Sequence, residues 1–94
     1  MVRHIVCWKL KDDVNKSESI KRMKDELTAL VGKIEGLVSL EVGECFSGEW
    51  DAALCSVLES REALEVYRTH PEHVKAQQFV HTVMLERSAA DFEF

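Results

Sequence analysis

The sequence predicts an α+β protein with a ferredoxin-like fold, built as one domain over residues 1–94. Two observations carry this prediction. Alternating apolar residues mark four extended segments, and apolar residues at helical spacing mark two helical regions. The segments follow one another in the order β-α-β-β-α-β, which produces a four-stranded antiparallel sheet with both helices on one face.

The first strand is expected over residues 3–11, and it carries apolar side chains on both faces. His4, Val6 and Trp8 point to one side, while Ile5 and the cysteine two positions later point to the other. This pattern is typical of a strand that is covered from both sides.

A helix is expected next, because apolar residues recur at helical spacing after a polar turn at residues 12–16. Ser17 or Ser19 can cap its N-terminus, and Gly32 and Gly36 mark its end. Its inward-facing stripe consists of Ile20, Met23, Leu27, Leu30, Val31 and Ile34.

Two further strands are expected over residues 37–46 and 50–58, joined by a turn at residues 47–49. The first of them places on one side Val38, Leu40 and Val42. The second is apolar on both sides, with Ala52, Leu54 and Leu58 against Ala53, Cys55 and Val57.

The second helical region is expected to contain two segments. Ser60 caps the first, which turns Leu64 and Tyr67 inward, and Pro71 begins the second. The inward-facing residues of the second segment are Val74, Phe79 or Val80, Val83 and Met84. A short closing strand at residues 91–94 ends the chain.

The strands also predict a partner for the sheet. Helices cover one face of it only, yet the first and third strands are apolar on both faces. A monomer would expose the second face as a large apolar patch, which soluble monomers avoid. A second copy of the chain can cover that patch with its own identical face. We therefore expect a homodimer whose two sheets pair into a dimeric α+β barrel with an interior.

Composition argues against several classes of protein. The net charge of −5 argues against a nucleic-acid partner, because nucleic-acid binders need a basic patch. No apolar run approaches the ~20 residues of a membrane span, and the N-terminal apolar stretch is too short for a signal peptide. Three cysteines without a CxxC pair suit a reducing compartment. We expect a cytoplasmic protein without a disulfide framework or a membrane partner.

Several segments together resemble the stress-responsive A/B-barrel family, also called Dabb for dimeric α+β barrel. HIVCWKLKDD is similar to that family's first strand, a histidine followed by apolar residues and a lysine-rich end. KIEGLVSLEVG resembles its K-I-P-G…E-V-G segment, with Glu35 where proline is common. WDAALCSVLESREALEVYRTHPEHV resembles its central block, and ADFEF its closing strand. The resemblance covers nearly the whole chain and implies a ferredoxin-like protomer in a homodimeric barrel.

The resemblance implies less about chemistry than about fold. Some plant members of the family cyclise linear polyketides with a tyrosine and the second histidine of a Tyr…His-Pro-x-His segment, beside a first-strand histidine. Those roles would fall on Tyr67, His73 and His4. More distant dimeric α+β barrels include cofactor-free monooxygenases, lactone isomerases and haem-degrading enzymes, and fold alone does not choose among these activities.

The segment from Tyr67 to His73, YRTHPEH, also supports this chemistry directly. With Pro71 at the first helical position, His73 lies at the third, where the positive helix end disfavours imidazolium. A neutral imidazole is a general base, and the Tyr67 phenol can hydrogen-bond a developing enolate, so the pair could remove a proton next to a carbonyl. The plainer interpretation is that Tyr67 packs in the core and His73 bonds a helix end. His70 is expected to cap the helix.

His4, Val6 and Trp8 share a sheet face and complete the candidate site. If that face lines the barrel interior, His4 is a polar group in an apolar cavity, the usual setting of a small-molecule site. Val6 and Trp8 would then contact the ligand, whereas a bulky Trp8 could equally fill the space. The plainer interpretation of His4 is a core histidine satisfied by a neighbour.

No cofactor or metal site is predicted. His70 and His73 are three residues apart, but a zinc site needs three or four ligands, and neither HExxH nor CxxC is present. The expected function is binding of a small apolar or aromatic ligand in the barrel of the homodimer. Two alternatives stay open. One is a cofactor-free enzyme acting on a carbonyl substrate, and the other is a structural stress protein with a packed barrel.

Overall fold

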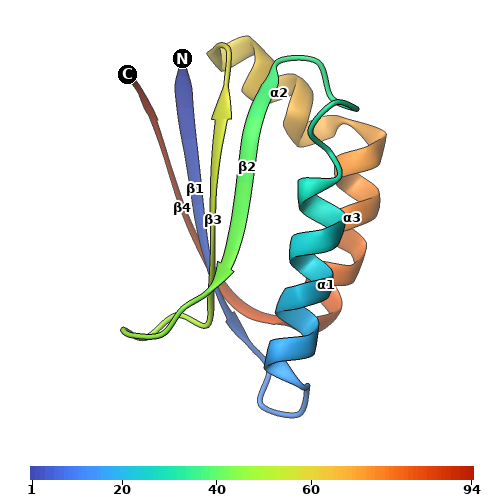
Figure 1. The fold of residues 1–94 in the computed structure, drawn as a ribbon, viewed down its shortest axis with the longest axis vertical. Helices are drawn as coiled ribbons and strands as arrows, with labels where there is room; N and C mark the ends of the chain where they lie inside the picture. Colours follow the sequence, from blue (N-terminus) through green and yellow to red (C-terminus); the bar gives the residue numbers. More distant parts are fainter.

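Four strands and three helices follow one another in the computed structural model, which describes residues 1–94 (Figure 1). In chain order they are β1 (Val2–Leu10), α1 (Lys16–Thr28), β2 (Leu37–Glu44), β3 (Ala52–Leu58), α2 (Arg61–Thr69), α3 (Pro71–Val83) and β4 (Met84–Glu93). The three helices lie together on one side of the sheet, and its other side is uncovered. The predicted ferredoxin-like α+β protomer is confirmed, with its second helical region divided at Pro71. None of the helices has the length and apolar character needed to cross a membrane.

Neighbouring strands of the sheet are antiparallel throughout, in the order β2-β3-β1-β4. β1 therefore lies in the interior of the sheet, and β2 and β4 form its edges. The register pairs His4 of β1 with Ser56 of β3 on one side and with Asp91 of β4 on the other. This pairing places residues from opposite ends of the chain next to each other.

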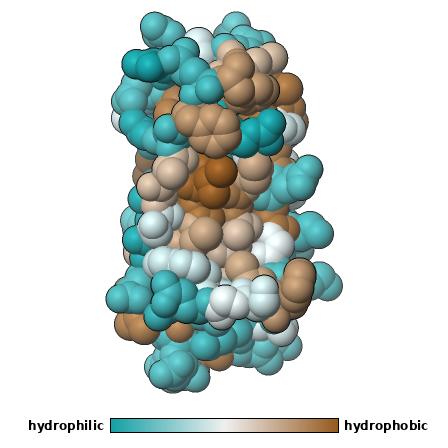
Figure 2. All heavy atoms as spheres, turned by 90° about the vertical axis from the view of Figure 1, so that its left-hand side faces the viewer, coloured by the Kyte–Doolittle hydropathy of each residue, from teal (hydrophilic) through white to brown (hydrophobic).

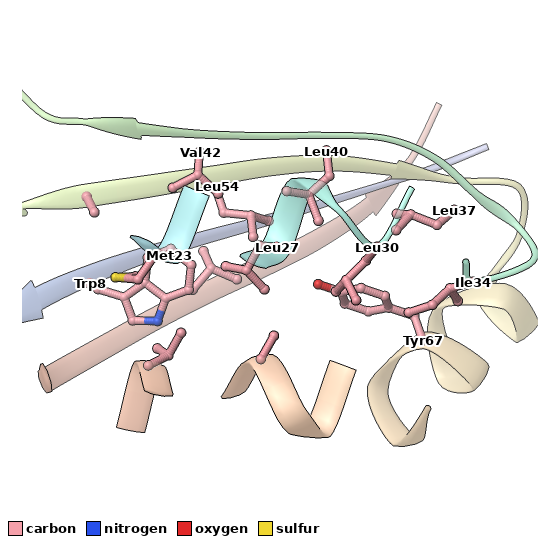
Figure 3. Close-up of a cluster of buried hydrophobic side chains, with 14 of the residues drawn as sticks. Trp8, Met23, Leu27, Leu30, Ile34, Leu37, Leu40, Val42, Leu54 and Tyr67 are labelled. Atoms are coloured by element: carbon pink, nitrogen blue, oxygen red, sulfur yellow. The ribbon is translucent and has the colours of Figure 1, made fainter. Parts of the chain in front are cut away.

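The core lies between the sheet and the helices, where the inner face of the strands meets the apolar stripes of the helices (Figure 3). Every second residue of β1 from Val2 to Leu10 is buried, while the residues between them are only half-buried. Met23 of α1 and Leu58 of β3 are both 0% exposed. Complete burial of such a side chain contributes roughly 1.5–3 kcal/mol to stability, so this layer holds the protomer together.

The closing strand differs from the prediction, which confined it to residues 91–94. β4 begins at Met84 and pairs along nearly the whole of β1. Met84, expected to face inward from a helix, is the residue at which α3 ends and the strand begins. The sequence that follows it, LERSAA, contains no β-branched or aromatic residue. Backbone pairing with β1, rather than side-chain preference, therefore makes this segment a strand.

The boundaries of the first helix also differ from the expectation. Asn15, and not Ser17 or Ser19, caps α1 by accepting a hydrogen bond from the amide of Glu18. The helix ends at Thr28, and turns occupy the rest of the predicted helical stretch. An asparagine is as good a cap as a serine, and it stands at the point where the preceding turn closes.

Val31 and Val74, which were predicted to face inward, are exposed, and so is Val38, which was predicted to share a side with Leu40 and Val42. Val31 lies in the turns after α1, where helical spacing no longer applies. A register shift between Leu37 and Ser39 turns Val38 outward and Leu37 inward. The residues that α3 buries are His73, Ala76, Val80 and Val83.

The uncovered face of the sheet carries an apolar patch surrounded by polar residues (Figure 2). Ile5 of β1 points to this face, as do Cys55 and Val57 of β3. A groove of about 460 Å³ extends over this face to the β2–β3 hairpin, where Phe46 is fully exposed. The predicted two-sided apolar character of the central strands is present in the structure.

Candidate active site

A small cavity of about 30 Å³ lies between α3 and the sheet. His4, Val6 and Trp8 of β1 line it, together with Tyr67 from α2 and His73 from the first turn of α3. The structure thus brings together all the residues that the sequence singled out for the site. The covering layer differs from the expectation, because the protomer's own helices, and not a second sheet, cover this face of β1.

The break between α2 and α3 sets the geometry of Tyr67 and His73. His70 ends α2 in an extended conformation and caps α3, because its ring nitrogen accepts a hydrogen bond from the amide of Glu72. Pro71 begins α3. The first amide of a helix has no acceptor within the helix, and proline has no amide hydrogen, so nothing is left unpaired there. The two helices then stack the rings of Tyr67 and His73, with 4.0 Å between centroids and 30° between planes. The predicted cap and helix start are confirmed.

His73 is held in one tautomer with a lowered affinity for protons. Its Nδ1 lies 3.3 Å from the carbonyl oxygen of Arg68. Because a carbonyl oxygen only accepts, Nδ1 donates, and Nε2 of the neutral ring carries the lone pair. Burial lowers the pKa of His73 below its usual 6.5, and the nearby His4 and Arg87 lower it further, against the opposing effect of the Arg68 hydrogen bond. Desolvation, more than the helix end, therefore keeps this ring neutral.

Tyr67 lies between the two histidines and is 1% exposed. Its ring centroid is 6.0 Å from that of His4, in an edge-on arrangement. Burial raises the pKa of Tyr67 to about 12, despite the opposing positive charge of Arg87. The hydroxyl forms no hydrogen bond with a protein group and is not sealed from the cavity. A protonated phenol in this position can donate to an oxygen of a bound molecule.

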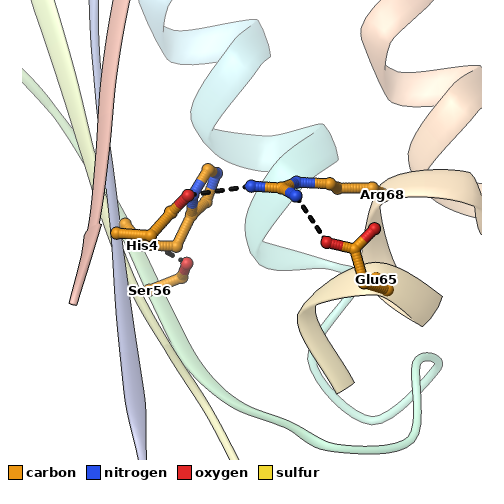
Figure 4. A network of polar contacts seen from close by, with 5 residues as sticks. His4, Ser56, Glu65 and Arg68 are labelled. Atoms are coloured by element: carbon orange, nitrogen blue, oxygen red, sulfur yellow. Dashed lines mark hydrogen bonds and ion pairs between the residues drawn. The ribbon is translucent and has the colours of Figure 1, made fainter. Parts of the chain in front are cut away.

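His4 is oriented by polar contacts that the sequence did not reveal (Figure 4). Its Nδ1 is bonded to the carboxylate of Asp91, whose other oxygen pairs with Arg68 at 2.8 Å. Arg68 also pairs with Glu65, and the Ser56 hydroxyl donates to the His4 carbonyl oxygen at 3.2 Å. The carboxylate fixes the tautomer of His4, so that Nε2 is the nitrogen left for other partners.

Asp91 and Arg87 are the candidate residues that sequence reasoning missed. Both lie in β4, most of which was not predicted as a strand. Asp91 is the residue directly opposite His4, and Arg87 is directly opposite Trp8 and lines the cavity. One feature of the sequence could have indicated Asp91. It lies in the predicted closing strand, and a residue of a neighbouring strand had to lie opposite His4.

The size of the cavity limits what it can hold. About 30 Å³ accommodates one or two water molecules, whereas sites for drug-sized ligands measure about 300–1,000 Å³. Buried residues close its inner side, and it borders solvent at the exposed residues His81 and Arg87. A compound of a few atoms could reach Tyr67 and His73 from that side. A larger aromatic compound would require side chains such as Trp8 to move.

Other reactive side chains are scattered. No group of three or more His, Cys, Asp or Glu side chains that could hold a metal ion forms in the structure. All three cysteines are free, and Cys7 and Cys55 lie on the uncovered face of the sheet, away from the cavity. The convergent polar groups are those around His4, Tyr67 and His73.

Together, the fold and the site define a ferredoxin-like α+β protomer with a histidine-lined cavity under its helices and an apolar open face. The chain belongs to the stress-responsive A/B barrel domain family, Dabb, whose model matches residues 2–94. The family predicted from the sequence motifs is thereby confirmed.

Solved structures share this fold over almost the whole chain. A dimeric ferredoxin-like protein of unknown function from Bacteroides fragilis is 37% identical, with a TM-score of 0.90, and 99% of this chain and 95% of that chain are covered. A dimeric ferredoxin-like protein of unknown function from Thermobifida fusca is 23% identical, with a TM-score of 0.87 and 99% and 90% covered. A hydroxynitrile lyase from Passiflora edulis is 13% identical, with a TM-score of 0.83 and 97% and 90% covered. No match is found among curated proteins.

Proposed function

We propose that the cavity binds a small carbonyl compound and that His73 and Tyr67 carry out proton transfer on it. The observation that carries this proposal is the Tyr67 hydroxyl, which opens to the cavity, has no protein partner and lies in a ring stacked on a neutral histidine. An oxygen of a bound ligand would supply the partner that this phenol lacks.

In the proposed step, Nε2 of His73 accepts a proton from the carbon next to the carbonyl group. The electron pair of the broken C–H bond moves onto the carbonyl oxygen, and the Tyr67 hydroxyl stabilises the enolate by a hydrogen bond. The proton then returns from His73 to the same or another carbon, which regenerates the free base. His4, held by Asp91 and lining the same cavity, would exchange a second proton in an isomerisation or addition.

The dimensions of the cavity favour a compound of a few heavy atoms over the apolar or aromatic ligand that the sequence suggested. Val6 and Trp8 would contact the apolar part of this compound, since both line the cavity. The Passiflora edulis protein with the same fold is a hydroxynitrile lyase, so the fold can support lyase activity. At 13% identity this likeness extends to the fold alone.

We further propose that the protein is a homodimer in the cytoplasm. The apolar open face needs a cover, and the Bacteroides fragilis relative with 37% identity is dimeric. A two-fold partner would place its own sheet over Ile5, Cys55 and Val57 and over the groove of about 460 Å³ beside them. The free cysteines suit the reducing conditions of the cytoplasm.

Deuterium exchange into pyruvamide tests the acid–base proposal, because this small neutral compound carries a methyl group next to its ketone. Loss of the methyl proton signal in D₂O is followed by NMR. We expect the wild type to accelerate exchange and His73→Gln to reduce the acceleration about 100-fold, as for loss of a general base. Tyr67→Phe should cause a reduction of about 100-fold, as for loss of a hydrogen bond to an oxyanion.

A pH series and a matched histidine variant give the controls. Only neutral His73 accepts a proton, so the rate should fall in acid with a midpoint below pH 6.5, because its pKa is lowered. His70→Asn keeps a good helix cap outside the cavity and should exchange like the wild type. Equal acceleration by the wild type and His73→Gln, with melting curves that show both are folded, would remove His73 from the mechanism.

The second candidate function is structural, and the small volume of the cavity is the observation that favours it. On this alternative, Trp8 and its neighbours fill the space under α3, and Tyr67 is satisfied by trapped water. The ring signals of His4 and His73 would then be unchanged by any small carbonyl compound, including pyruvamide at millimolar concentration.

A further inference from the structure

Arg87 is the arginine of this chain without a protein partner. The other arginines are engaged: Arg3 lies over the Phe94 ring, Arg22 pairs with Glu26, Arg61 with Glu93, and Arg68 with Glu65 and Asp91. In a chain of net charge −5, acidic partners are not scarce. An arginine that stays free beside a cavity is therefore available to a ligand.

The position of Arg87 directs it toward the candidate site. It lies directly opposite Trp8 in the β1–β4 register, and both residues line the cavity. Trp8 is buried while Arg87 is exposed, so the guanidinium stands where the cavity meets solvent. Its positive charge reaches the inner groups, since it acts on the pKa of both Tyr67 and His73.

The charges around the cavity leave Arg87 uncompensated. Asp91 is the acidic group beside His4, and its two oxygens are already occupied by His4 and Arg68. Glu86, the neighbour of Arg87 in β4, pairs with Lys9 at 3.6 Å. The remaining titratable groups that line the cavity are histidines and Tyr67. The entrance is consequently a site of positive potential on an acidic protein.

We infer that Arg87 binds the carboxylate of the substrate, so that the site takes small 2-oxo acids in preference to neutral carbonyl compounds. The planar guanidinium matches a carboxylate with two parallel hydrogen bonds, which fixes the orientation as well as the affinity of a ligand. This inference rests on the proposed function and adds the substrate class to it.

The dimensions of the site agree with a short acid. The cavity of about 30 Å³ has room for one or two water-sized groups, so the charged group of the ligand stays at the entrance with Arg87. The adjacent ketone can then point inward, where the Tyr67 hydroxyl and the His73 ring lie next to each other. In a 2-oxo acid the ketone is directly bonded to the carboxylate, which suits this short span.

Pyruvate and pyruvamide test the inference as a matched pair, because they have nearly the same shape and differ in charge. Each is titrated into the protein while the ring signals of His4 and His73 are followed by NMR. We expect pyruvate to bind the wild type at least about tenfold more tightly, equivalent to about 1.4 kcal/mol. Added salt should weaken pyruvate binding and leave pyruvamide binding nearly unchanged.

Substitutions at Arg87 test whether this residue causes the preference for pyruvate over pyruvamide. Arg87→Gln should bring the two dissociation constants to within about twofold, and Arg87→Lys should retain part of the preference as a point charge. Arg61→Gln removes an arginine that lies outside the cavity, on α2, and should keep the wild-type preference. The wild-type comparison of the two compounds stands even if an Arg87 variant fails to fold.

The possible outcomes distinguish the role of Arg87 from the proposed acid–base function of His73 and Tyr67. If both compounds shift the two histidines with equal dissociation constants, or if Arg87→Gln keeps the wild-type preference, the assignment of Arg87 is wrong and the acid–base site remains. If neither compound shifts His4 or His73, the cavity does not take small carbonyl compounds, and both proposals are wrong.

Discussion

On the helix-covered face of the sheet, Trp8 and Leu58 are almost completely buried, whereas their chain neighbours Cys7 and Val57 lie half-buried on the open face. The two faces come from the same strands, and both carry apolar side chains. They differ in what covers them, since the first is closed by the protomer's own helices and the second is open (Figures 1 and 2).

This difference assigns the two faces different roles. The polar groups with fixed partners, His4 and His73, lie on the covered side together with the buried Tyr67. The residues of one protomer are sufficient to bury these three side chains, so the candidate site does not need a second chain to be complete. The open face carries no comparable cluster, and the proposed association of two protomers would cover its apolar surface.

The largest expected effect comes from a charge on the open face. Ile5→Glu places a carboxylate at the centre of the proposed interface, and two-fold symmetry places it there twice. Burial of an unpaired charge costs several kcal/mol per ion, so the dimer should dissociate at micromolar concentration. Light scattering should give the dimer mass for the wild type and the monomer mass for the variant.

Val66→Glu is the control for this experiment, because Val66 is exposed on α2, away from the open face. It should remain dimeric. In the Ile5→Glu monomer, the NMR signals of the His4 and His73 rings should match those of the wild type, which would show that the site is still formed. A monomeric wild type would overturn the dimer proposal, and loss of the site in the Ile5→Glu monomer would show that the two faces are coupled.

A smaller effect is expected from adjacent residues of β3 that point to opposite faces. Leu58→Ala should lower the free energy of unfolding by about 2–5 kcal/mol at any protein concentration, since it empties a fully buried position. Val57→Ala should lower it by about 1 kcal/mol, and by more when the dimer is populated. Urea denaturation at two protein concentrations measures both. Equal losses that do not depend on concentration would contradict the difference between the faces.

A further effect, confined to alkaline pH, concerns the ionisation of Tyr67, the only tyrosine in the chain. Its ultraviolet titration should have a midpoint of about 12 in the folded protein and of about 10 in urea. Because folding raises this pKa, the stabilising contribution is complete below pH 10 and is lost as the pH rises toward 12. At about 1.4 kcal/mol per pKa unit, the loss approaches ~3 kcal/mol. A folded-state midpoint near 10 would mean that the phenol is open to solvent.

The sequence was most informative where side chains alternate strongly or where a motif restricts the backbone. The strands β1 and β3 were located to within a residue or two, and His70 and Pro71 were assigned correctly as cap and helix start. β4 was mostly missed, because its polar and alanine-rich sequence becomes a strand only by pairing with β1. Val38 was placed on the wrong side, since a register shift in β2 is not visible in the alternation.

For the candidate site, chain-local features were predictable and long-range partners were not. His4, Tyr67 and His73 could be named because a first-strand histidine and the YRTHPEH segment stand out in the sequence. Asp91 and Arg87 could not be named, because their roles arise from the register that sets β4 beside β1. The volume of the cavity depends on how Trp8 packs under α3, which no pattern of residue types specifies.

The sequence by itself determined the ferredoxin-like order of elements, the two apolar faces of the sheet and the break that stacks Tyr67 on His73. These follow from local periodicity and from the restricted backbone of proline. Only the tertiary structure decided that His4 faces the protomer's own helices, that Asp91 orients it and that Arg87 stands free at the entrance of a small cavity. Those features depend on strand register and close packing, in which residues far apart in the chain fix one another's positions.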